Sequence, residues 1–272
     1  MGTLYIVPTP IGNLEDMTFR GLRILKEVSL IAAEDTRTSR VLLDHYEIQT
    51  PLTSYHEHNK IGKLDAIFDA LMHGDVALIS DAGMPGISDP GYELIREAIA
   101  QNIEVVPLPG ANAVITALVG SGLPADSFIY LGFLPKKQNA RRDLLKSLKS
   151  EKRTLVAYES PHRLADTLGQ IRAVMGDDRQ VCVGRELTKK FEAYVRGTAA
   201  KVHQHFVEEN PKGEVTLVIG GATNGKIWAR DDVLAELERL TDAGESLSRA
   251  AKQIATESGW KKSDVYALGL EE

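Results

Sequence analysis

The sequence has one cysteine and no long apolar run, and each scarcity excludes a class of protein. A single thiol, Cys182, cannot form a disulfide within the chain, which fits a reducing compartment. No stretch approaches the roughly 18 apolar residues that a membrane-spanning helix needs. The opening residues, MGTLYIVPTPIGN, lack the basic start and apolar core of a signal peptide. We therefore expect a cytoplasmic protein without a membrane partner.

Several nucleotide-binding and catalytic motifs are missing as well. No Gly-x-Gly-x-x-Gly follows an expected strand, so the dinucleotide fingerprint is absent. The segment GGATNGKI resembles a phosphate-binding loop, but Ile227 stands where a magnesium-binding Ser or Thr is required, which favours a linker. Two His-x-His pairs lack a Cys or Glu partner at metal spacing, so we expect no metal site. The lack of a nucleophile elbow argues against serine hydrolase chemistry.

Positive charge is scarce overall but concentrated in one segment. The net charge is −6, whereas residues 136–153 carry eight Lys or Arg against two acids, a local +6 that leaves −12 for the remainder. Two interpretations fit this composition equally well. The segment could be a solvated helix face that buries its leucines, or a patch for an anionic partner.

Strand-like and helix-like runs alternate through the first half of the chain. We expect strands at 4–9, 30–35, 52–56, 76–81 and 104–109, and helices near 17–27, 37–46, 60–73 and 90–101, with another after Gly110. Apolar strands separated by helices indicate right-handed βαβ units in a parallel sheet. We assign residues 1–122 to this first α/β domain. Its ligands should bind beyond the carboxyl ends of the strands.

From about residue 125 the strand candidates are spaced differently. Two of them, in QVCVGREL and FEAYVRG, are too close in sequence for a helical crossover, so we expect them to pair antiparallel. Residues 123–222 are therefore expected to form a second α/β domain with a mixed sheet. A basic helix over 138–150 should lie near its start.

The C-terminal residues 228–272 are expected to be helical and to resemble a helix-turn-helix. Ser246 and Ser263 are placed as caps of two helices, and Gly259 ends the first of them. Lys261 and Lys262 open the second helix, where phosphate contacts would be made. The competing interpretation is a plain helical hairpin packed on the rest of the protein.

The loop SDAGMPGISDPG, residues 80–91, is much longer than a strand-to-helix connection requires. Gly83 and Gly86 would let the backbone approach a ligand closely. We place Asp89 as the N-cap of the following helix, with the next proline at its first position. Asp81 remains free to accept hydrogen bonds from a hydroxyl or an ammonium. Because the loop holds acids and no lysine, it suits a neutral or cationic ligand better than a polyphosphate.

Motifs along the whole chain closely resemble the small-subunit ribosomal RNA methyltransferase I family. In order, they are VPTPIGN, AAEDTRTS, SDAGMPGISDPG, VPLPGANAVITAL, GFLP, YESPHRL, GRELTKKFE and GEVTLVI. That family belongs to the tetrapyrrole-methylase-like class of S-adenosylmethionine enzymes, which have two α/β domains around the cofactor and are typically homodimers. The resemblance implies 2′-O-methylation of a cytidine ribose in small-subunit (16S) ribosomal RNA, free or in an assembled subunit. One departure is Met84, where the family usually carries threonine.

The resemblance also implies where the ligands bind. Cofactor contacts are expected at Pro8, Pro10, Asp81, Ala82, Gly83, Met84, Gly86, Ala111, Asn112, Ala113, Ser160, Pro161, Thr216 and Leu217. Candidates that could help to remove the ribose proton are Glu34, Asp35 and Glu159. RNA contacts are expected at Arg37, His58, Arg141, Arg142, Arg163, Arg185, Lys261 and Lys262. A structural ion pair is the competing interpretation for each charged residue.

Two other functions stay open. The first is a small-molecule methyltransferase of the same class that acts on a tetrapyrrole. Such enzymes resemble one another in a Gly-Gly-Asp-Pro loop, which SDAGMPG lacks, and they need neither the basic segment nor the tail. The second is a non-catalytic RNA-binding module, against which the complete set of pocket loops argues.

Overall fold

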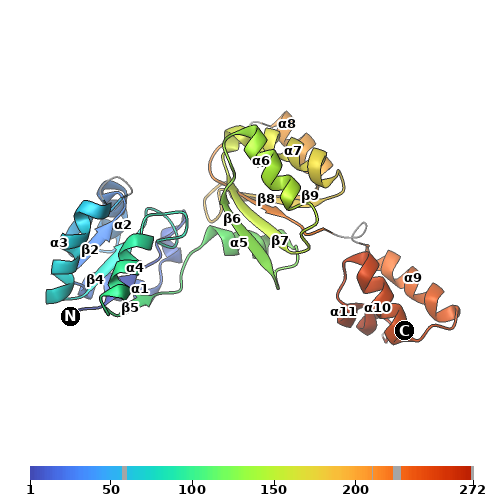
Figure 1. Ribbon diagram of the computed structural model, residues 1–272, viewed down its shortest axis with the longest axis horizontal. Helices are drawn as coiled ribbons and strands as arrows, with labels where there is room; N and C mark the ends of the chain where they lie inside the picture. The colour runs from blue at the N-terminus through green and yellow to red at the C-terminus, as the bar shows by residue number, and fades with distance from the viewer. Residues whose placement is uncertain (57–59, 210, 223–227, 271–272) are drawn as a thin grey trace.

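The computed structural model describes residues 1–56, 60–209, 211–222 and 228–270, which form three parts in a row (Figure 1). Two α/β domains come first, and a group of three helices forms the C-terminal part. In the described part of the chain, no helix is both long and apolar enough to cross a membrane. The two α/β domains and the helical tail follow the order that we expected from the sequence.

The first domain is built on a parallel sheet of five strands in the order β3-β2-β4-β1-β5. The strands are β1 Leu4–Ile6, β2 Leu30–Ala33, β3 Leu52–Ser54, β4 Val76–Ile79 and β5 Val105–Pro107. The helices are α1 Phe19–Glu27, α2 Thr36–His45, α3 Lys60–His73 and α4 Tyr92–Ala100, with a 3-10 turn at Leu14–Asp16. Every strand ends before its expected limit, because the residues that follow it turn into the loops that carry the site.

The second domain is built on a mixed sheet in the order β6-β7-β10-β8-β9. Its strands are β6 Phe128–Phe133, β7 Thr154–Glu159, β8 Gln180–Arg185, β9 Ala193–Thr198 and β10 Val215–Ile219. β6 and β7 are parallel, whereas β8 and β9 pair antiparallel, as expected from the short connection between them. One face of the sheet is covered by α6 Gln138–Ser147, α7 Leu164–Met175 and α8 Ala199–Glu208.

Helix α5, Ala113–Ser121, packs on the second sheet and not on the first domain, to which we had assigned it. Its Val114, Ala117 and Leu118 share a core with Val156 and Val218 of the second sheet. A helix that is apolar on most of its surface needs a large apolar partner, and the face of the second sheet opposite α6–α8 supplies one. By its packing, the second unit therefore begins with α5.

The tail consists of α9 Arg230–Asp242, α10 Leu247–Ser258 and α11 Lys262–Leu268. The three helices form a core of their own, so α9 covers the apolar face of the expected hairpin. Gly259 ends α10 in a left-handed conformation, as predicted. Ser246 is the N-cap residue of α10, as predicted, although its side chain makes no cap hydrogen bond. The prediction that Ser263 caps the next helix was wrong, because α11 starts at Lys262 and its N-cap is Lys261.

Candidate active site

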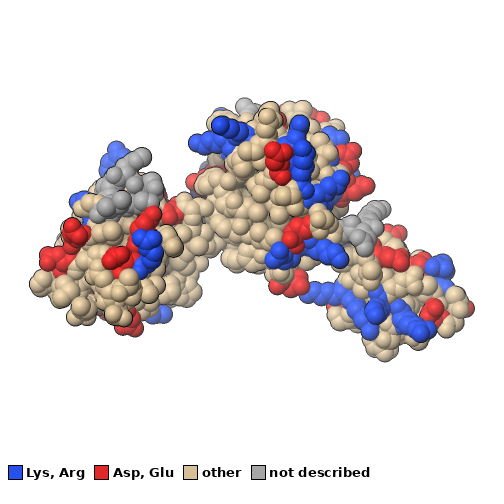
Figure 2. All heavy atoms as spheres, in the orientation of Figure 1, with Lys and Arg blue, Asp and Glu red and all other residues tan. Residues whose placement is uncertain are grey.

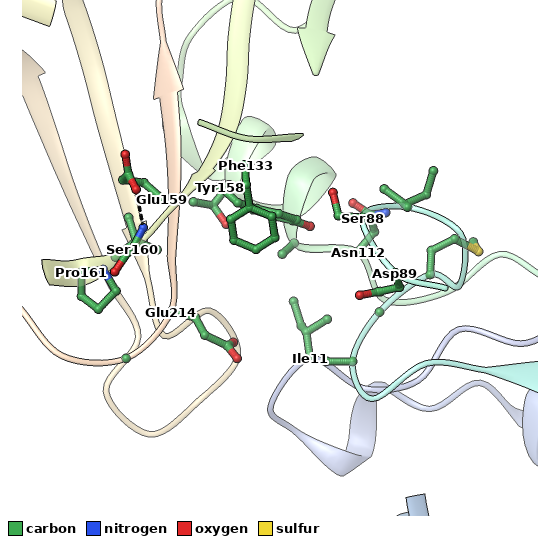
Figure 3. Close-up of a pocket in the computed structure, with 18 residues that line it drawn as sticks. Ile11, Ser88, Asp89, Asn112, Phe133, Tyr158, Glu159, Ser160, Pro161 and Glu214 are labelled. Carbon is green, nitrogen blue, oxygen red and sulfur yellow. Dashed lines mark hydrogen bonds between the residues drawn. The ribbon is translucent and has the colours of Figure 1, made fainter. Parts of the chain in front are cut away.

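A cavity of about 410 Å³ lies between the first two domains, beyond the carboxyl end of β4 (Figure 3). This volume falls in the range of roughly 300–1,000 Å³ that is usual for small-molecule sites. The lining residues are Ile11, Ala82, Gly83, Met84, Ile87, Ser88, Asp89, Asn112, Ala113, Phe133, Tyr158, Glu159, Ser160, Pro161, Gly213, Glu214, Val215 and Thr216. The cavity therefore has one wall of loop backbone from the first domain and one wall of strand ends from the second.

The loop that follows β4 is anchored to the loop that follows β1. Thr9 and Gly83 exchange two backbone hydrogen bonds, each of 2.9 Å, and the Thr9 hydroxyl donates to the Ser80 carbonyl at 3.0 Å. Gly83 has φ +85°, a left-handed conformation that favours glycine. A Cβ there would make ordinary contacts with Ile11 at 3.4 Å and the Ala111 carbonyl oxygen at 3.9 Å, so the backbone angle favours glycine and lack of space does not require it.

Two predicted site carboxylates, Glu34 and Asp81, fasten the loops after β2 and β4 to each other. The Asp81 backbone N–H donates to Glu34 at 3.2 Å, and the Asp35 backbone N–H donates to Asp81 at 3.0 Å. Partial burial raises the pKa of both Glu34 and Asp81. The acids thus brace the first-domain wall from behind, because neither of them lines the cavity.

Asp35 is held by its own helix. It is the N-cap of α2, accepts from the Arg37 backbone N–H at 2.8 Å and pairs with the Arg37 guanidinium at 2.7 Å. Hydrogen bonds from Arg37 lower the pKa of Asp35 to about 2. A carboxylate with this pKa takes up a proton poorly at neutral pH, so the geometry fits a cap better than a general base.

Asp89 faces the cavity, and our placement of it as a helix cap was wrong. Helix α4 begins at Tyr92, and its N-cap is Gly91, which makes no side-chain cap hydrogen bond. Burial raises the pKa of Asp89 to about 7, and the negative charges of Glu34 and Asp81 add to the shift, against a hydrogen bond from Ser80. Asp89 is therefore a cavity-lining carboxyl that titrates near neutral pH.

Glu159 has a different environment on the opposite wall. Its side chain is fully buried and accepts from the Ser160 N–H at 2.6 Å, the Thr167 hydroxyl at 2.6 Å and Arg163 at 2.5 Å. Arg163 also donates to the Pro135 carbonyl at 3.2 Å. Both Glu159 oxygens are engaged, so the geometry fits a residue that shapes the loop after β7 and does not fit a proton acceptor. Arg163 is likewise committed to internal contacts and not free for phosphate.

Aromatic side chains cover the middle of the second-domain wall. The rings of Tyr130 and Phe133 lie 5.5 Å and 5.2 Å from the ring of Tyr158. The Tyr130 hydroxyl lies 2.6 Å from the Ser88 hydroxyl of the first domain, so a hydrogen bond joins the two walls. Figure 3 shows Phe133 and Tyr158 together on this wall, facing the loop of Ser88 and Asp89.

The structure brings together most of the predicted cofactor contacts. Those that line the cavity are Ala82, Gly83, Met84, Asn112, Ala113, Ser160, Pro161 and Thr216. Pro8, Pro10, Asp81, Gly86, Ala111 and Leu217 do not line it. Leu217 does not line it because its side chain is fully buried in the core beneath α6–α8.

The prediction from the sequence missed half of the lining. The additional residues are Ile11, Ile87, Ser88, Asp89, Phe133, Tyr158, Gly213, Glu214 and Val215, with Glu159 present in a role other than the expected one. The ISD run of the long loop was a usable signal for Ile87, Ser88 and Asp89. Phe133 and Tyr158 lie in the motifs GFLP and YESPHRL, but these motifs did not show that the two rings face the cavity, which depends on how the second sheet packs against the first domain.

The residues that we predicted to contact RNA do not form a single surface. Arg141 is 1% exposed and pairs with Asp166 and Gln170, so the prediction that it contacts RNA was wrong. Arg142, the next residue of the same helix, is exposed. Arg37 is exposed but paired with Asp35. His58 lies outside the described residues.

Two further predicted contacts, Lys261 and Lys262, lie on the tail surface. Lys262 donates to the Ser248 hydroxyl at 3.1 Å, which leaves Lys261 as the more available cation. Arg185, the last residue of β8, donates to the Lys212 carbonyl at 3.3 Å. Figure 2 shows Lys and Arg side chains gathered on the tail and on the second domain.

Comparison with known proteins agrees with this architecture. The model of the tetrapyrrole (corrin/porphyrin) methylases matches residues 3–203. The ribosomal RNA small subunit methyltransferase I of Halalkalibacterium halodurans is 48% identical, over 98% of this chain and 94% of that protein. The protein of that name from Synechocystis sp. is 47% identical, over 100% of this chain and 98% of its own.

Solved structures share the fold at low identity. Uroporphyrin-III C-methyltransferase from Thermus thermophilus, complexed with S-adenyl homocysteine, has a TM-score of 0.56 and 18% identity, over 80% of this chain and 97% of that chain. Cobalt precorrin-4 methyltransferase has a TM-score of 0.57 and 16% identity, over 80% of this chain and 94% of that chain. The two-domain architecture and the near-full-length identity lead to one conclusion: the chain belongs to the tetrapyrrole methylase family and, within it, to the ribosomal RNA small subunit methyltransferase I family.

Proposed function

We propose that this protein transfers a methyl group from S-adenosylmethionine to the ribose 2′-hydroxyl of a cytidine in small-subunit ribosomal RNA. The observation that carries the proposal is identity of 43–48% to ribosomal RNA small subunit methyltransferases I, over nearly the whole chain. The assignment of the methylated atom to a cytidine 2′-hydroxyl rests on the sequence motifs that resemble those of this family.

The cavity fits S-adenosylmethionine in chemistry as well as in size. Within the described residues its lining includes Asp89 and Glu214 but no Lys or Arg, which suits a ligand that carries a sulfonium and an ammonium. Ile11, Met84 and Val215 provide apolar surface for the uncharged parts of the molecule. The left-handed backbone at Gly83 keeps a side chain out of the same space.

S-adenosylmethionine, when bound, supplies an already activated methyl group. The residues of this chain then have to align the ribose hydroxyl and take up its proton. We assign the second task to Asp89, because it lines the cavity and its pKa of about 7 matches neutral pH. The Asp89 carboxylate would take up the 2′-hydroxyl proton as the oxygen gains the methyl group, whose bond to the sulfonium sulfur would break to leave the neutral thioether S-adenosylhomocysteine.

RNA is held by cations outside the cavity. Arg142 on α6 and Lys261 and Lys262 on the tail are exposed and suited to contact phosphates. Such contacts displace counterions, so RNA binding should weaken as the salt concentration rises. Because folded RNA is recognised mainly by shape, these residues hold the substrate and do not read its sequence.

The direct test is transfer of labelled methyl to purified small subunits, followed by mass spectrometry of the nucleosides. Wild-type protein should place one label on a cytidine ribose, and ribosomal RNA from cells that lack the protein should lose that modification. Label on a tetrapyrrole and none on RNA would favour the small-molecule alternative. Bound S-adenosylmethionine without transfer to either substrate would favour the non-catalytic module. We also propose that the protein acts in the cytoplasm, because its proposed substrate is ribosomal RNA.

We further propose that the protein is a homodimer, as the resemblance implies. One face of α5 packs on the second sheet, but Ile115 and Val119 on its outer surface are 48% and 71% exposed. Burial of such an apolar face between two copies would be favourable. Sedimentation equilibrium should give twice the mass of one chain, and Val119→Glu should give the mass of one chain.

A further inference from the structure

Phe133 is the last residue of β6 and holds an unusual position on the cavity wall. Its side chain lines the cavity, yet the residue is 63% exposed. A phenyl ring that stays exposed to water does not contribute the favourable free energy that its burial would add to folding, so this position suggests a role other than stability.

A β-bulge turns Phe133 toward the cavity. Tyr130 pairs with Val156, but Phe133 pairs with Tyr158, so β6 has one more residue than β7 across this interval. Without the extra residue, Phe133 would point to the helix-covered face, as Leu131 does. Bulges are common beside active sites, where they redirect a side chain.

The bulge depends on Gly132. Its φ is +66°, a left-handed conformation that other residues adopt at a cost in conformational energy. After the bulge, Leu134 returns to the core beneath α6–α8 and is 1% exposed. The bulge thus changes the alternation of side chains along β6 locally, and its result is that the Phe133 ring faces the cavity.

From this geometry we infer that the Phe133 ring is the stacking surface for the base of the nucleotide that is methylated. Tyr158 supports the ring from the wall side, with centroids 5.2 Å apart and planes tilted by 56°. Unstacked RNA bases are commonly bound on aromatic side chains in this manner. A base held at the cavity mouth would bring its own ribose into the cavity, toward Asp89. The inference rests on the proposed function.

The surroundings favour a nucleotide of RNA over the adenine of the cofactor. Lys136 and Lys137 follow Phe133 closely and are exposed, and no ion pair of either is found within the part of the chain that the structure describes. Two exposed cations that follow Phe133 by three and four residues would repel the cationic cofactor, whereas they would attract the phosphates that flank a stacked base. Of the loops expected to hold the cofactor, the one at 82–84 belongs to the opposite wall, whereas Ser160, Pro161 and Thr216 share the wall of Phe133.

The test compares substitutions at Phe133 in the full-length protein. Phe133→Ala should lower kcat/KM for small subunits by about 5- to 150-fold, the usual size of one base–aromatic stack, with unchanged affinity for S-adenosylmethionine in calorimetry. Phe133→Tyr and Phe133→Trp should retain most activity, whereas Phe133→Leu should not, because leucine keeps apolar volume without an aromatic face. The matched control is Phe19→Ala, which removes a phenyl ring that is 93% exposed and does not line the cavity.

A second readout reports stacking directly. A fluorescent cytidine analogue at the methylated position of the RNA should be quenched by the wild-type protein and by Phe133→Trp, but not by Phe133→Leu. Wild-type kinetics of Phe133→Ala would overturn the inference, as would a loss of cofactor affinity as large as the loss of kcat/KM. A change of Phe133→Ala from dimer to monomer would instead make the ring a subunit contact. Failure of the wild-type protein to methylate any small-subunit RNA would be a failure of the proposed function itself.

Discussion

The two walls of the cavity hold their acidic groups in opposite ways. On the first-domain wall, Glu34, Asp81 and Asp89 all have raised pKa values, because they are partly buried and close to one another. On the second-domain wall, Glu159 is paired with Arg163, and Glu214 is paired with Lys189 at 2.9 Å. Negative charge is therefore concentrated on one wall and neutralised on the other.

We infer from this difference that the first wall takes part in the reaction, whereas the charged pairs of the second wall maintain the shape of the cavity. A carboxyl with a pKa near 7 can exchange a proton with a substrate at neutral pH, whereas a fully hydrogen-bonded carboxylate cannot. The second wall uses its charged pairs to hold the strand ends that present Phe133 and Tyr158. We expect substitutions on the first wall to change turnover or cofactor affinity, and those on the second wall to change stability or RNA recognition.

The largest effect is expected at Asp89. Asp89→Asn should lower kcat by about 10²- to 10⁴-fold, the usual contribution of a general base, and should leave cofactor affinity unchanged. The active form is the carboxylate, which is present above the pKa of about 7, so wild-type activity should fall as pH drops through neutrality. Single-turnover rates between about pH 5.5 and about pH 9 would measure this, and the residual rate of the variant should not depend on pH in this range.

The matched control for Asp89 is the acid on the other wall. Glu214→Gln also changes a cavity-lining carboxylate to an amide, but Glu214 is already paired with Lys189 and its side chain is 73% exposed. Its turnover should stay close to wild type. Equal losses in the two variants would remove the distinction between the walls.

A large effect on stability is expected at Glu159. Glu159→Ala leaves Arg163 without its buried partner, and the loss of one member of a buried pair typically costs about 3–5 kcal/mol. Chemical denaturation should show this loss in the free energy of unfolding. Asp89→Asn should show no such loss, because it removes a carboxylate whose ionised form is disfavoured by burial. Wild-type stability of Glu159→Ala would mean that the ion pair is dispensable.

An intermediate effect on cofactor binding is expected at Gly83. Gly83→Val forces a branched residue to a φ of +85°, at a cost of roughly 1–3 kcal/mol, or displaces the loop from Thr9. The cofactor dissociation constant should rise about 5- to 150-fold in calorimetry. Gly122→Val is the control, since Gly122 has a φ of +73°, lies at the end of α5 and has open space at its Cβ. It should lower stability without changing cofactor affinity.

The smallest effect is expected at the tail. Lys261→Glu should reduce the affinity for small-subunit RNA modestly and lower the slope of log affinity against log salt by about 1, the value for one lost phosphate contact. Cofactor affinity should not change, because α10 and α11 pack with α9 in a core that includes no residue of the cavity lining. Lys26→Glu, an exposed charge reversal on α1, is the control. An unchanged salt slope for Lys261→Glu would limit the RNA surface to the two α/β domains.

Much of the architecture follows from local patterns in the sequence. Alternation of apolar strands with helices determined the parallel sheet of the first domain, and the short connection between β8 and β9 determined their antiparallel pairing. The glycines and acids of residues 80–91 indicated a ligand loop without phosphate chemistry, and Gly83 does line the cavity. These features were predictable because strand periodicity, connection length and glycine geometry act between near neighbours in the chain.

Tertiary structure alone decided which side chains face the cavity and which are buried elsewhere. Arg141 has the same local charge pattern as Arg142, but the approach of α7 and its Asp166 buries only Arg141. Asp89 resembles a helix cap in sequence, yet α4 starts later, and burial, with a smaller contribution from the carboxylates of Glu34 and Asp81, raises its pKa. Phe133 reaches the cavity through a bulge that is defined only by pairing with β7. Each outcome depends on groups that are distant in sequence, because burial, charge and register are set by the neighbours that folding brings into contact.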